Sequence, residues 1–394
     1  MTDEHEKRGR KFSAETVVTH AGRHPERHLG FVNTPVFRGS TILFDTLDDL
    51  ENTAPRYDYG RTGNPSASAV EDLVTELEDA AGTVLCPSGL SAVSLALLSI
   101  VSAGGHVLIT DGTYQPTRRF ATNVLERLGI SVEYYDPRIG AGIEGLITGK
   151  TQAVYVESPS SLTFELQDLP AIARAAHARG AKVIVDNSWA TPLYYHPLAL
   201  GADIVLHAGT KMFVGHSDAM FGTVTAGTDT WKALKQTHLY LGLCASPDDC
   251  FLAARGLRTL ALRMREHSGR SIELASWLET EAGVARVFHP ALPSHPDHAL
   301  FARDFSGSGS VFSFLLQPKP RAALAAMLDG FELFGMGWSW GGYESLCLPI
   351  HPEKTRSVRE WTDQGHLLRL HVGLEDVGDL KSDLAAALAR YRAA

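Results

Sequence analysis

The sequence has 394 residues, of which 44% are hydrophobic and 21% charged, and a formal net charge of −9 at pH 7. This is the composition of a soluble globular protein, and a chain of this length is expected to fold as two packed domains. The acidic balance excludes nucleic acid as a partner, because phosphates require a basic face.

The N-terminal segment gives no sign of export. Residues 1–11 are polar and include the acidic Asp3, Glu4 and Glu6, so they resemble neither a signal peptide nor a transit peptide. The longest apolar stretch, residues 95–101, is too short to cross a bilayer. We therefore expect a cytoplasmic protein with no membrane partner.

The cysteines and histidines do not predict a metal site. Cys86, Cys244, Cys250 and Cys347 form no CxxC pair, so neither a zinc site nor a disulfide framework is indicated. Three of the 17 histidines, at 289, 295 and 298, are separated by prolines and read as a loop without ligand spacing. We expect no metal.

From residue 64 onward, helical and strand patterns alternate. Helices are predicted at 69–80, 91–101, 117–128 and 169–179. Short apolar strands are predicted at 106–110, 131–135, 153–156, 182–185 and 204–206, with 221–225 open to an antiparallel place at an edge. This alternation predicts an α/β fold with a mainly parallel sheet.

The rhythm changes after about residue 255. A long helix at 257–282 is followed by a strand at 311–316, a helix at 320–329 and a strand at 367–372, which suggests a smaller α+β domain. The predicted divisions are an irregular N-terminal arm (1–63), an α/β domain (64–255) and a C-terminal domain (256–394).

Chemically active side chains follow three predicted strands: Glu157, Asp186 and, five residues beyond its strand, Lys211. The carboxyl ends of parallel strands share one edge, where ligands bind. A lysine amine, a carboxylate and the helix start at Ser88-Gly89 meet the needs of pyridoxal phosphate, which has an aldehyde, a pyridine nitrogen and a phosphate. Each feature alone also fits a cap, a turn or a solvated surface.

Several ordered segments resemble the Cys/Met-metabolism pyridoxal-phosphate enzymes of fold type I, the aspartate-aminotransferase superfamily. The lysine segment is AGTKMFVGHSD at 208–218. The others are YDYGR at 57–61 with NP at 64–65, PSGLSA at 87–92, VDNSWA at 185–190, SPDD at 246–249 with RGLRT at 255–259, and SWGGYES at 339–345.

The resemblance implies a cofactor held as a Schiff base on Lys211, with Asp186 at the pyridine nitrogen. It also implies the following contacts: phosphate bound by Ser88, Gly89, Leu90 and Thr210, the ring stacked on Tyr114, the phenolic oxygen near Ser161, and the substrate carboxylate held by Arg369.

Tyr59 and Arg61 would complete the phosphate site from the neighbouring subunit, so the resemblance implies a homodimer, or a homotetramer built as a pair of dimers. Tyr114 would also assist proton transfer, and Lys211 would remove the substrate Cα proton. Alone, Tyr114 also fits a core aromatic, and Arg369 a structural ion pair.

The segments at 185–190 and 339–345 resemble the cystathionine β-lyase branch, which implies β-elimination of cystathionine to homocysteine, pyruvate and ammonia, a step of methionine biosynthesis. Ser339, Trp340 and Trp338 would line the substrate site. The alternatives are a specialised cysteine-conjugate lyase, a γ-synthase or sulfhydrylase, and a relative that binds the cofactor without catalysis.

Three residues depart from the family pattern. Ala208 replaces a serine that contacts phosphate in many members, Met212 replaces a tyrosine, and Trp338 replaces a tyrosine common in β-lyases. By the resemblance, the last change lies near the side chain of the substrate, so the sulfur compound that the site accepts is left open.

Overall fold

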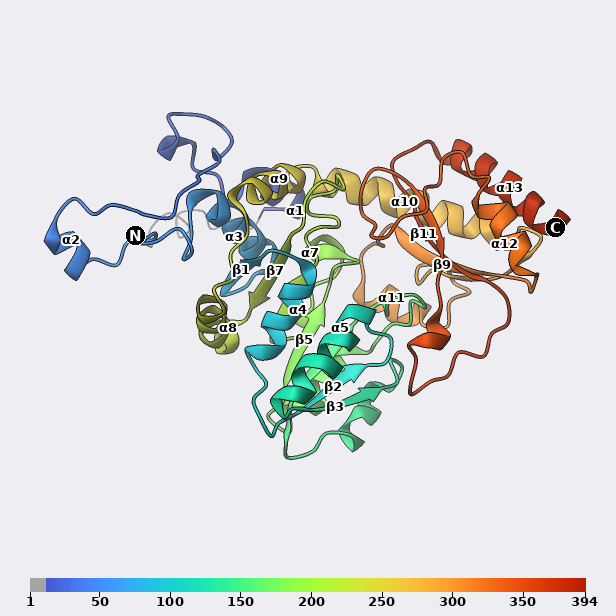
Figure 1. Ribbon diagram of the computed structural model, residues 1–394, viewed down its shortest axis with the longest axis horizontal. Helices are drawn as coiled ribbons and strands as arrows, with labels where there is room; N and C mark the ends of the chain where they lie inside the picture. The colour runs from blue at the N-terminus through green and yellow to red at the C-terminus, as the bar shows by residue number, and fades with distance from the viewer. Residues whose placement is uncertain (1–11) are drawn as a thin grey trace.

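The computed structural model describes residues 12–394 and contains two β-sheets joined by a long helix (Figure 1). The prediction that residues 1–11 form no targeting peptide concerns residues outside the described part of the chain. Within residues 12–394 no helix is long and apolar enough to cross a membrane.

The larger sheet has seven strands in the order β1-β7-β6-β5-β4-β2-β3. Their bounds are β1 Gly82–Cys86, β2 His106–Thr110, β3 Ser131–Tyr135, β4 Thr151–Glu157, β5 Lys182–Asp186, β6 Ile204–His207 and β7 Gly222–Ala226. Strands β2 to β6 pair in parallel, whereas β7 is antiparallel to both β1 and β6. The edge placement considered for 221–225 is therefore wrong, because β1 pairs with β7 and forms the edge itself.

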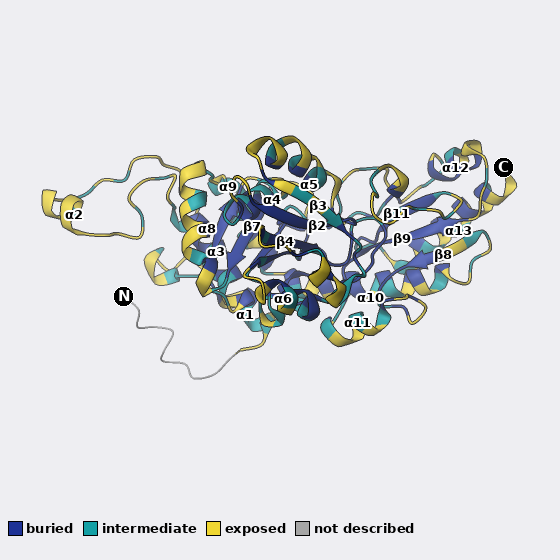
Figure 2. Cartoon of the chain, turned by 90° about the horizontal axis from the view of Figure 1, so that it is seen from below, coloured by how far each residue is buried: buried dark blue, intermediate teal, exposed yellow. Residues whose placement is uncertain are grey.

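Helices cover both faces of this sheet and bury it. They are α3 Pro65–Glu78, α4 Gly89–Leu98, α5 Gln115–Phe120, α6 Leu169–His177, α7 Thr191–Tyr194, α8 Thr228–Leu241 and α9 Pro247–Leu257. One core cluster lies between the sheet and α4, and another between the sheet and α6. Central strands are apolar on both sides because neither face meets water, as the dark strands of Figure 2 show.

The smaller sheet is antiparallel, in the order β10-β11-β9-β8. Its elements are β8 Val284–Phe288, β9 Val311–Leu316, β10 Leu346–Pro349 and β11 Leu367–His371, with α11 His298–Asp304, α12 Arg321–Leu328 and α13 Val377–Ala393. The predicted strand at 311–316 matches β9. This second sheet and its core cluster form the expected α+β unit.

Two predicted helices are interrupted or change type along their length in the structure. The helix expected at 257–282 is α10, Leu260–Leu278, separated from α9 by a break at Arg258 and Thr259. Helix α10 contributes to a core cluster of each sheet and so ties the two together (Figure 1). The helix expected at 117–128 is α5, which continues as a π turn and a 3₁₀ turn to Leu128.

Part of the N-terminal segment, including the short helix α2 Leu47–Asn52, extends away from the body as an exposed arm (Figures 1 and 2). The other short helix, α1 Ala14–His20, packs on the body, and its Val18 is buried in a core cluster with residues of α3 and α9. The sequence suggested only irregular chain at both places. Several apolar side chains of the arm face solvent, among them Leu29 at 95% and Leu43 at 87% exposure.

Candidate active site

Lys211 lies four residues beyond the end of β6, in a partly buried position. Its Nζ donates a hydrogen bond to Ser339 Oγ and lies 5.4 Å from the centroid of the Trp340 ring. Burial, together with the nearby Arg369 guanidinium, lowers the pKa of Lys211 to about 8, while Asp186 acts in the opposite direction. The amine is therefore far easier to deprotonate than an exposed lysine.

Asp186 and Glu157 are neighbours at the ends of β5 and β4, paired directly across the two strands. Asp186 accepts a hydrogen bond from the Ser188 N–H at 2.9 Å, and the Tyr155 hydroxyl lies 3.4 Å from its other oxygen. Burial raises the pKa of Asp186, and burial together with Asp186 raises the pKa of Glu157 to about 8. Among residues 12–394, no lysine or arginine forms a salt bridge with Asp186.

The start of α4 approaches the Lys211 segment closely. Ser88 caps the helix by accepting from the Ser91 N–H at 3.1 Å, which leaves the N–H groups of Gly89 and Leu90 without intrahelical acceptors. A Cβ on Gly89 would lie 2.6 Å from the Ala208 Cβ, so only glycine fits there. Free N–H groups at a helix start are suited to binding a phosphate.

Arg369, on β11, meets the Lys211 site through the loop at 339–342. Its Nη2 donates to the Ser339 carbonyl oxygen at 2.9 Å, while the hydroxyl of the same serine accepts from Lys211. Burial lowers the pKa of Arg369 to about 10, and it remains a cation at neutral pH. Ser339 thus links the base to the predicted carboxylate-binding arginine.

Tyr114 follows β2 at the N-cap of α5 and is 46% exposed. Its N–H donates to Glu157 Oε2 at 2.7 Å, and burial, with Glu157, raises the pKa of its phenol. The Ser161 N–H donates to the Gly112 carbonyl at 2.9 Å, which places Ser161 beside the Tyr114 turn. Tyr114, Ser161 and Asp186 therefore gather at one edge of the sheet, as the sequence predicts.

Two predicted residues, Tyr59 and Arg61, lie apart from this group. Arg61 donates to the Leu239 carbonyl at the end of α8 at 3.3 Å, and its guanidinium lies 5.6 Å from the Tyr59 ring, so both residues belong to the arm side. Trp338 is 82% exposed. The Thr210 hydroxyl exchanges hydrogen bonds with the backbone of Phe221, so its predicted phosphate contact stays a prediction.

Two of the departures from the family pattern are accommodated locally. The Ala208 N–H donates to Ser188 Oγ at 2.6 Å, and its methyl faces Gly89, where a larger side chain has no room. Met212 is buried in the core cluster that includes Phe213 and Val214, so it fills apolar space and lies away from the site edge.

Sequence reasoning noted Glu157 without assigning it a role, and it missed Tyr155 and His371. Tyr155 precedes Glu157 by two residues, so strand alternation gives the signal that both side chains lie on one face. His371 Nε2 accepts from the Gly341 N–H at 3.2 Å and anchors the 339–342 loop. No local pattern predicts that contact, which links residues 30 positions apart.

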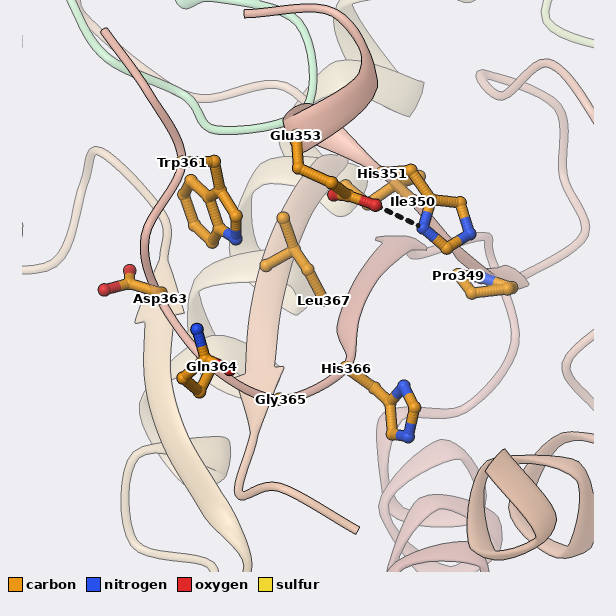
Figure 3. Close-up of a pocket in the computed structure, with 10 residues that line it drawn as sticks. All are labelled: Pro349, Ile350, His351, Glu353, Trp361, Asp363, Gln364, Gly365, His366 and Leu367. Atoms are coloured by element: carbon orange, nitrogen blue, oxygen red, sulfur yellow. Dashed lines mark hydrogen bonds and ion pairs between the residues drawn. The ribbon is translucent and has the colours of Figure 1, made fainter. Parts of the chain in front are cut away.

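The described residues contain no cluster of three His, Cys, Asp or Glu side chains able to hold a metal. A pocket of about 360 Å³, drawn in Figure 3, lies between β10 and β11 and contains none of the predicted site residues.

These features fit pyridoxal phosphate. The Asp186 carboxylate has no salt-bridge partner among the described side chains, which suits a protonated pyridine nitrogen. Lys211 has a lowered pKa for condensation with the aldehyde, and the α4 start has free N–H groups for the phosphate. The fold and the site together define a pyridoxal-phosphate enzyme of fold type I.

The chain belongs to the Cys/Met metabolism PLP-dependent enzyme family, whose model matches residues 15–389. Pyridoxal 5'-phosphate is accordingly its cofactor. The predicted fold type and family are both confirmed.

Three named proteins show which members of this family the chain is similar to. The chain is 47% identical to a putative cystathionine beta-lyase of Rhizobium johnstonii, over 95% of each chain. It is 40% identical to the cystathionine beta-lyase MetC of Escherichia coli, over 95% of this chain and 98% of that protein. It also resembles a crystal structure of cystathionine gamma synthase from Xanthomonas oryzae, with a TM-score of 0.90, 32% identity, and coverage of 98% and 100% of the two chains.

Proposed function

We propose that this protein is a carbon–sulfur β-lyase that converts cystathionine and water to homocysteine, pyruvate and ammonia. The observation that carries the proposal is the contact of Lys211 with Ser339 and Trp340, in the loop that resembles the β-lyase branch. The names of the relatives described above support the same branch. Homocysteine as product would place the reaction in methionine biosynthesis.

Lys211 is the base in this proposal. Its lowered pKa leaves a substantial neutral fraction near pH 8, and neutral amine is the form that accepts the substrate Cα proton. When bound, pyridoxal phosphate supplies an electron sink that stabilises the negative charge left at Cα. Ser339, which accepts from Nζ, holds the amine toward the substrate position.

Asp186 and Arg369 have separate roles in this proposal. Asp186 would hold a proton at the pyridine nitrogen of the bound cofactor, which would then supply an acceptor of electrons. Arg369 binds the α-carboxylate of the substrate through its planar fork, which fixes the direction of the Cα–H bond. Tyr114 would stack on the cofactor ring and assist proton transfer.

A cysteine conjugate is the second candidate substrate, favoured by Trp338. This indole is 82% exposed and adjoins the Ser339–Trp340 loop, so it offers an apolar surface at the mouth of the site. A bulky apolar sulfur substituent would gain contact there.

A product assay tests the β-lyase proposal. Purified protein with cystathionine should release pyruvate and homocysteine, and Lys211→Ala should abolish both together with the visible absorbance of lysine-bound cofactor. Release of 2-oxobutyrate and cysteine would show γ-cleavage instead. Replacement on an activated homoserine ester without pyruvate would show a transferase, and return of the proton at Cα without bond cleavage would show a racemase.

We also propose that the active unit is at least a homodimer in which Tyr59 and Arg61 act across the interface. The exposed apolar residues of the arm support this, since a monomer rarely exposes such a surface. A tetramer built from two dimers and a cytoplasmic location are further parts of the proposal.

Active-site complementation tests the shared site. If each site takes Arg61 from one subunit and Lys211 from the other, a dimer of one Arg61→Ala chain and one Lys211→Ala chain has two unequal sites. One site carries both substitutions, and the other has both native residues. Mixing denatured variants and refolding them should restore about one quarter of wild-type activity, because half of the dimers are mixed and each has one intact site. No recovery would place Arg61 and Lys211 in the same chain's site.

A further inference from the structure

Asp111, at the end of β2, is a fully buried carboxylate that receives an unusual set of donors from the C-terminal part of the chain. It accepts from the N–H groups of Ser357 at 2.9 Å, Val358 at 3.1 Å and Arg359 at 3.3 Å, and from the Ser357 hydroxyl at 2.8 Å. Arg118 completes the set at 2.5 Å. Successive N–H groups converging on one anion form a nest, a strong anion site.

Burial alone would raise the pKa of Asp111, but the hydrogen bonds from Ser357, Val358 and Arg359 lower it. The carboxylate is therefore charged at neutral pH, and its bonds are of the stronger, charge-assisted kind.

Arg356 is the second anchor of the same segment. Its side chain is 5% exposed and its Nη2 donates to both oxygens of Glu165, at 2.9 and 2.8 Å. The anchored residues 356–359 lie in the connection between β10 and β11, so these contacts fasten a connection of the smaller sheet to the larger one.

The rest of this connection is loosely packed. It surrounds the open pocket of about 360 Å³ lined by His351, Glu353, Trp361 and Asp363 (Figure 3). Most residues of this connection are exposed, and its apolar packing comes mainly from Ile350 and from Trp361, whose ring lies 5.7 Å from that of Phe288. The polar anchors at Asp111 and Glu165 therefore hold the segment.

Asp111 stands three residues before Tyr114, and the connection it holds leads directly into β11, which bears Arg369. The Tyr114 turn is also fixed from the sheet side, since Glu157 accepts from its N–H and from the Thr113 hydroxyl. A shift of the Asp111 anchor thus moves the ring-stacking tyrosine and the carboxylate-binding arginine relative to one another.

We propose that Asp111 is a positioning residue, which sets the distance between the Tyr114 turn and the Arg369 strand by holding the backbone of residues 357–359. The proposal rests on the roles of Tyr114 and Arg369 in the proposed function. It assigns Asp111 no contact with substrate or cofactor.

The test compares Asp111→Ala with Asp383→Ala in the full-length, cofactor-loaded protein. Asp383 is a matched control: it is 9% exposed and accepts from the N–H groups of Glu332 and Leu333, but lies within the smaller unit. Amide hydrogen exchange of residues 112–118 and 356–366 should accelerate about tenfold or more in Asp111→Ala alone, because local opening governs exchange.

Kinetics give a second readout. Asp111→Ala should raise KM and lower kcat/KM about tenfold or more, since small misplacement of binding groups is expensive for catalysis, whereas Asp383→Ala should change kcat/KM less than twofold. The dissociation constant for pyridoxal phosphate should also rise in Asp111→Ala. Equal exchange and equal kinetics in the two variants would overturn the proposal.

Ser357→Ala covers the case in which Asp111→Ala does not fold, because it removes one exposed hydroxyl and leaves the buried carboxylate with its backbone donors. Faster exchange restricted to 112–118 and 356–366 supports the proposal, and unchanged exchange overturns it. If the wild type shows no lyase activity, the proposed function fails, while the exchange comparison still decides whether Asp111 positions the two segments.

Discussion

Replacing Gly341 by alanine is expected to separate the 339–342 loop from Lys211. Gly341 has a φ of +92°, and a Cβ there would lie 2.9 Å from the Lys211 Cα and carbonyl carbon and 3.0 Å from its Cβ. These atoms cannot move away without displacing the segment that follows β6, so the loop must yield.

The penalty follows from two terms. A non-glycine residue at such a φ costs about 1–3 kcal/mol, and overpacking against fixed backbone adds about 1–3 kcal/mol. The effect on kcat/KM is smaller than this sum, because the docked position of the loop can be destabilised to some extent before the undocked position becomes populated. We therefore expect kcat/KM to fall by about 10- to 100-fold, equivalent to about 1.4–2.8 kcal/mol.

Steady-state kinetics with cystathionine, together with the visible absorbance of bound cofactor, measure the effect. Gly337→Ala, two residues before this loop, is the matched control, because a Cβ there meets only Leu346 Cδ2, at an ordinary 3.6 Å. Urea unfolding monitors global stability in both variants. Equal kcat/KM in Gly341→Ala and Gly337→Ala would refute the packing argument.

Three further predictions concern single residues. The pKa of Lys211 in the folded protein is lowered to about 8, so the fraction of reactive neutral amine grows as the pH rises through 8. Modification of the cofactor-free protein by an amine acylating reagent, followed at Lys211 by mass spectrometry, should therefore have its midpoint near pH 8. A midpoint near pH 10 would contradict the burial argument. Arg369→Lys should raise KM about 10- to 100-fold with unchanged cofactor absorbance, because an ammonium cannot replace a bidentate fork, and an unchanged KM would exclude Arg369 as the carboxylate site. Trp338→Ala should leave the midpoint of urea unfolding within the error of the wild-type value, because the indole is 82% exposed. It should change the ratio of the kcat/KM values for cystathionine and for an aromatic cysteine conjugate. An unchanged ratio would show that Trp338 does not select the substrate.

The strands of the larger sheet were predictable where they are buried on both faces. Strand β2, which is buried along its whole length, begins and ends at the predicted residues, because a short apolar run has few other places in a folded chain. The edge strand β3 also has the predicted bounds, although only its last residue, Tyr135, is buried. The position of β7 was not predictable, because β7 pairs with β1, which lies about 140 residues earlier in the chain. Local sequence carries no information on such distant pairing.

The same distinction applies to the site. Lys211, Asp186 and Glu157 were found together because each follows a strand of one sheet, and the common edge brings them close without further information. The contacts of Ser339 with Lys211 and of Ser357 with Asp111 span 128 and 246 residues. They depend on how the second unit docks, which neither periodicity nor strand order determines.

The conformation of Ser339 separates two tryptophans that have different surroundings. With a φ of +82°, Ser339 has a left-handed backbone conformation between Trp338 and Trp340. Trp340 packs beside Lys211, 5.4 Å from Nζ, whereas Trp338 faces solvent at 82% exposure. A substitution at 338 alters the mouth of the site without touching the residue that holds the base, so the tyrosine-to-tryptophan departure from the family pattern is expected to act on substrate choice and to leave proton removal by Lys211 intact.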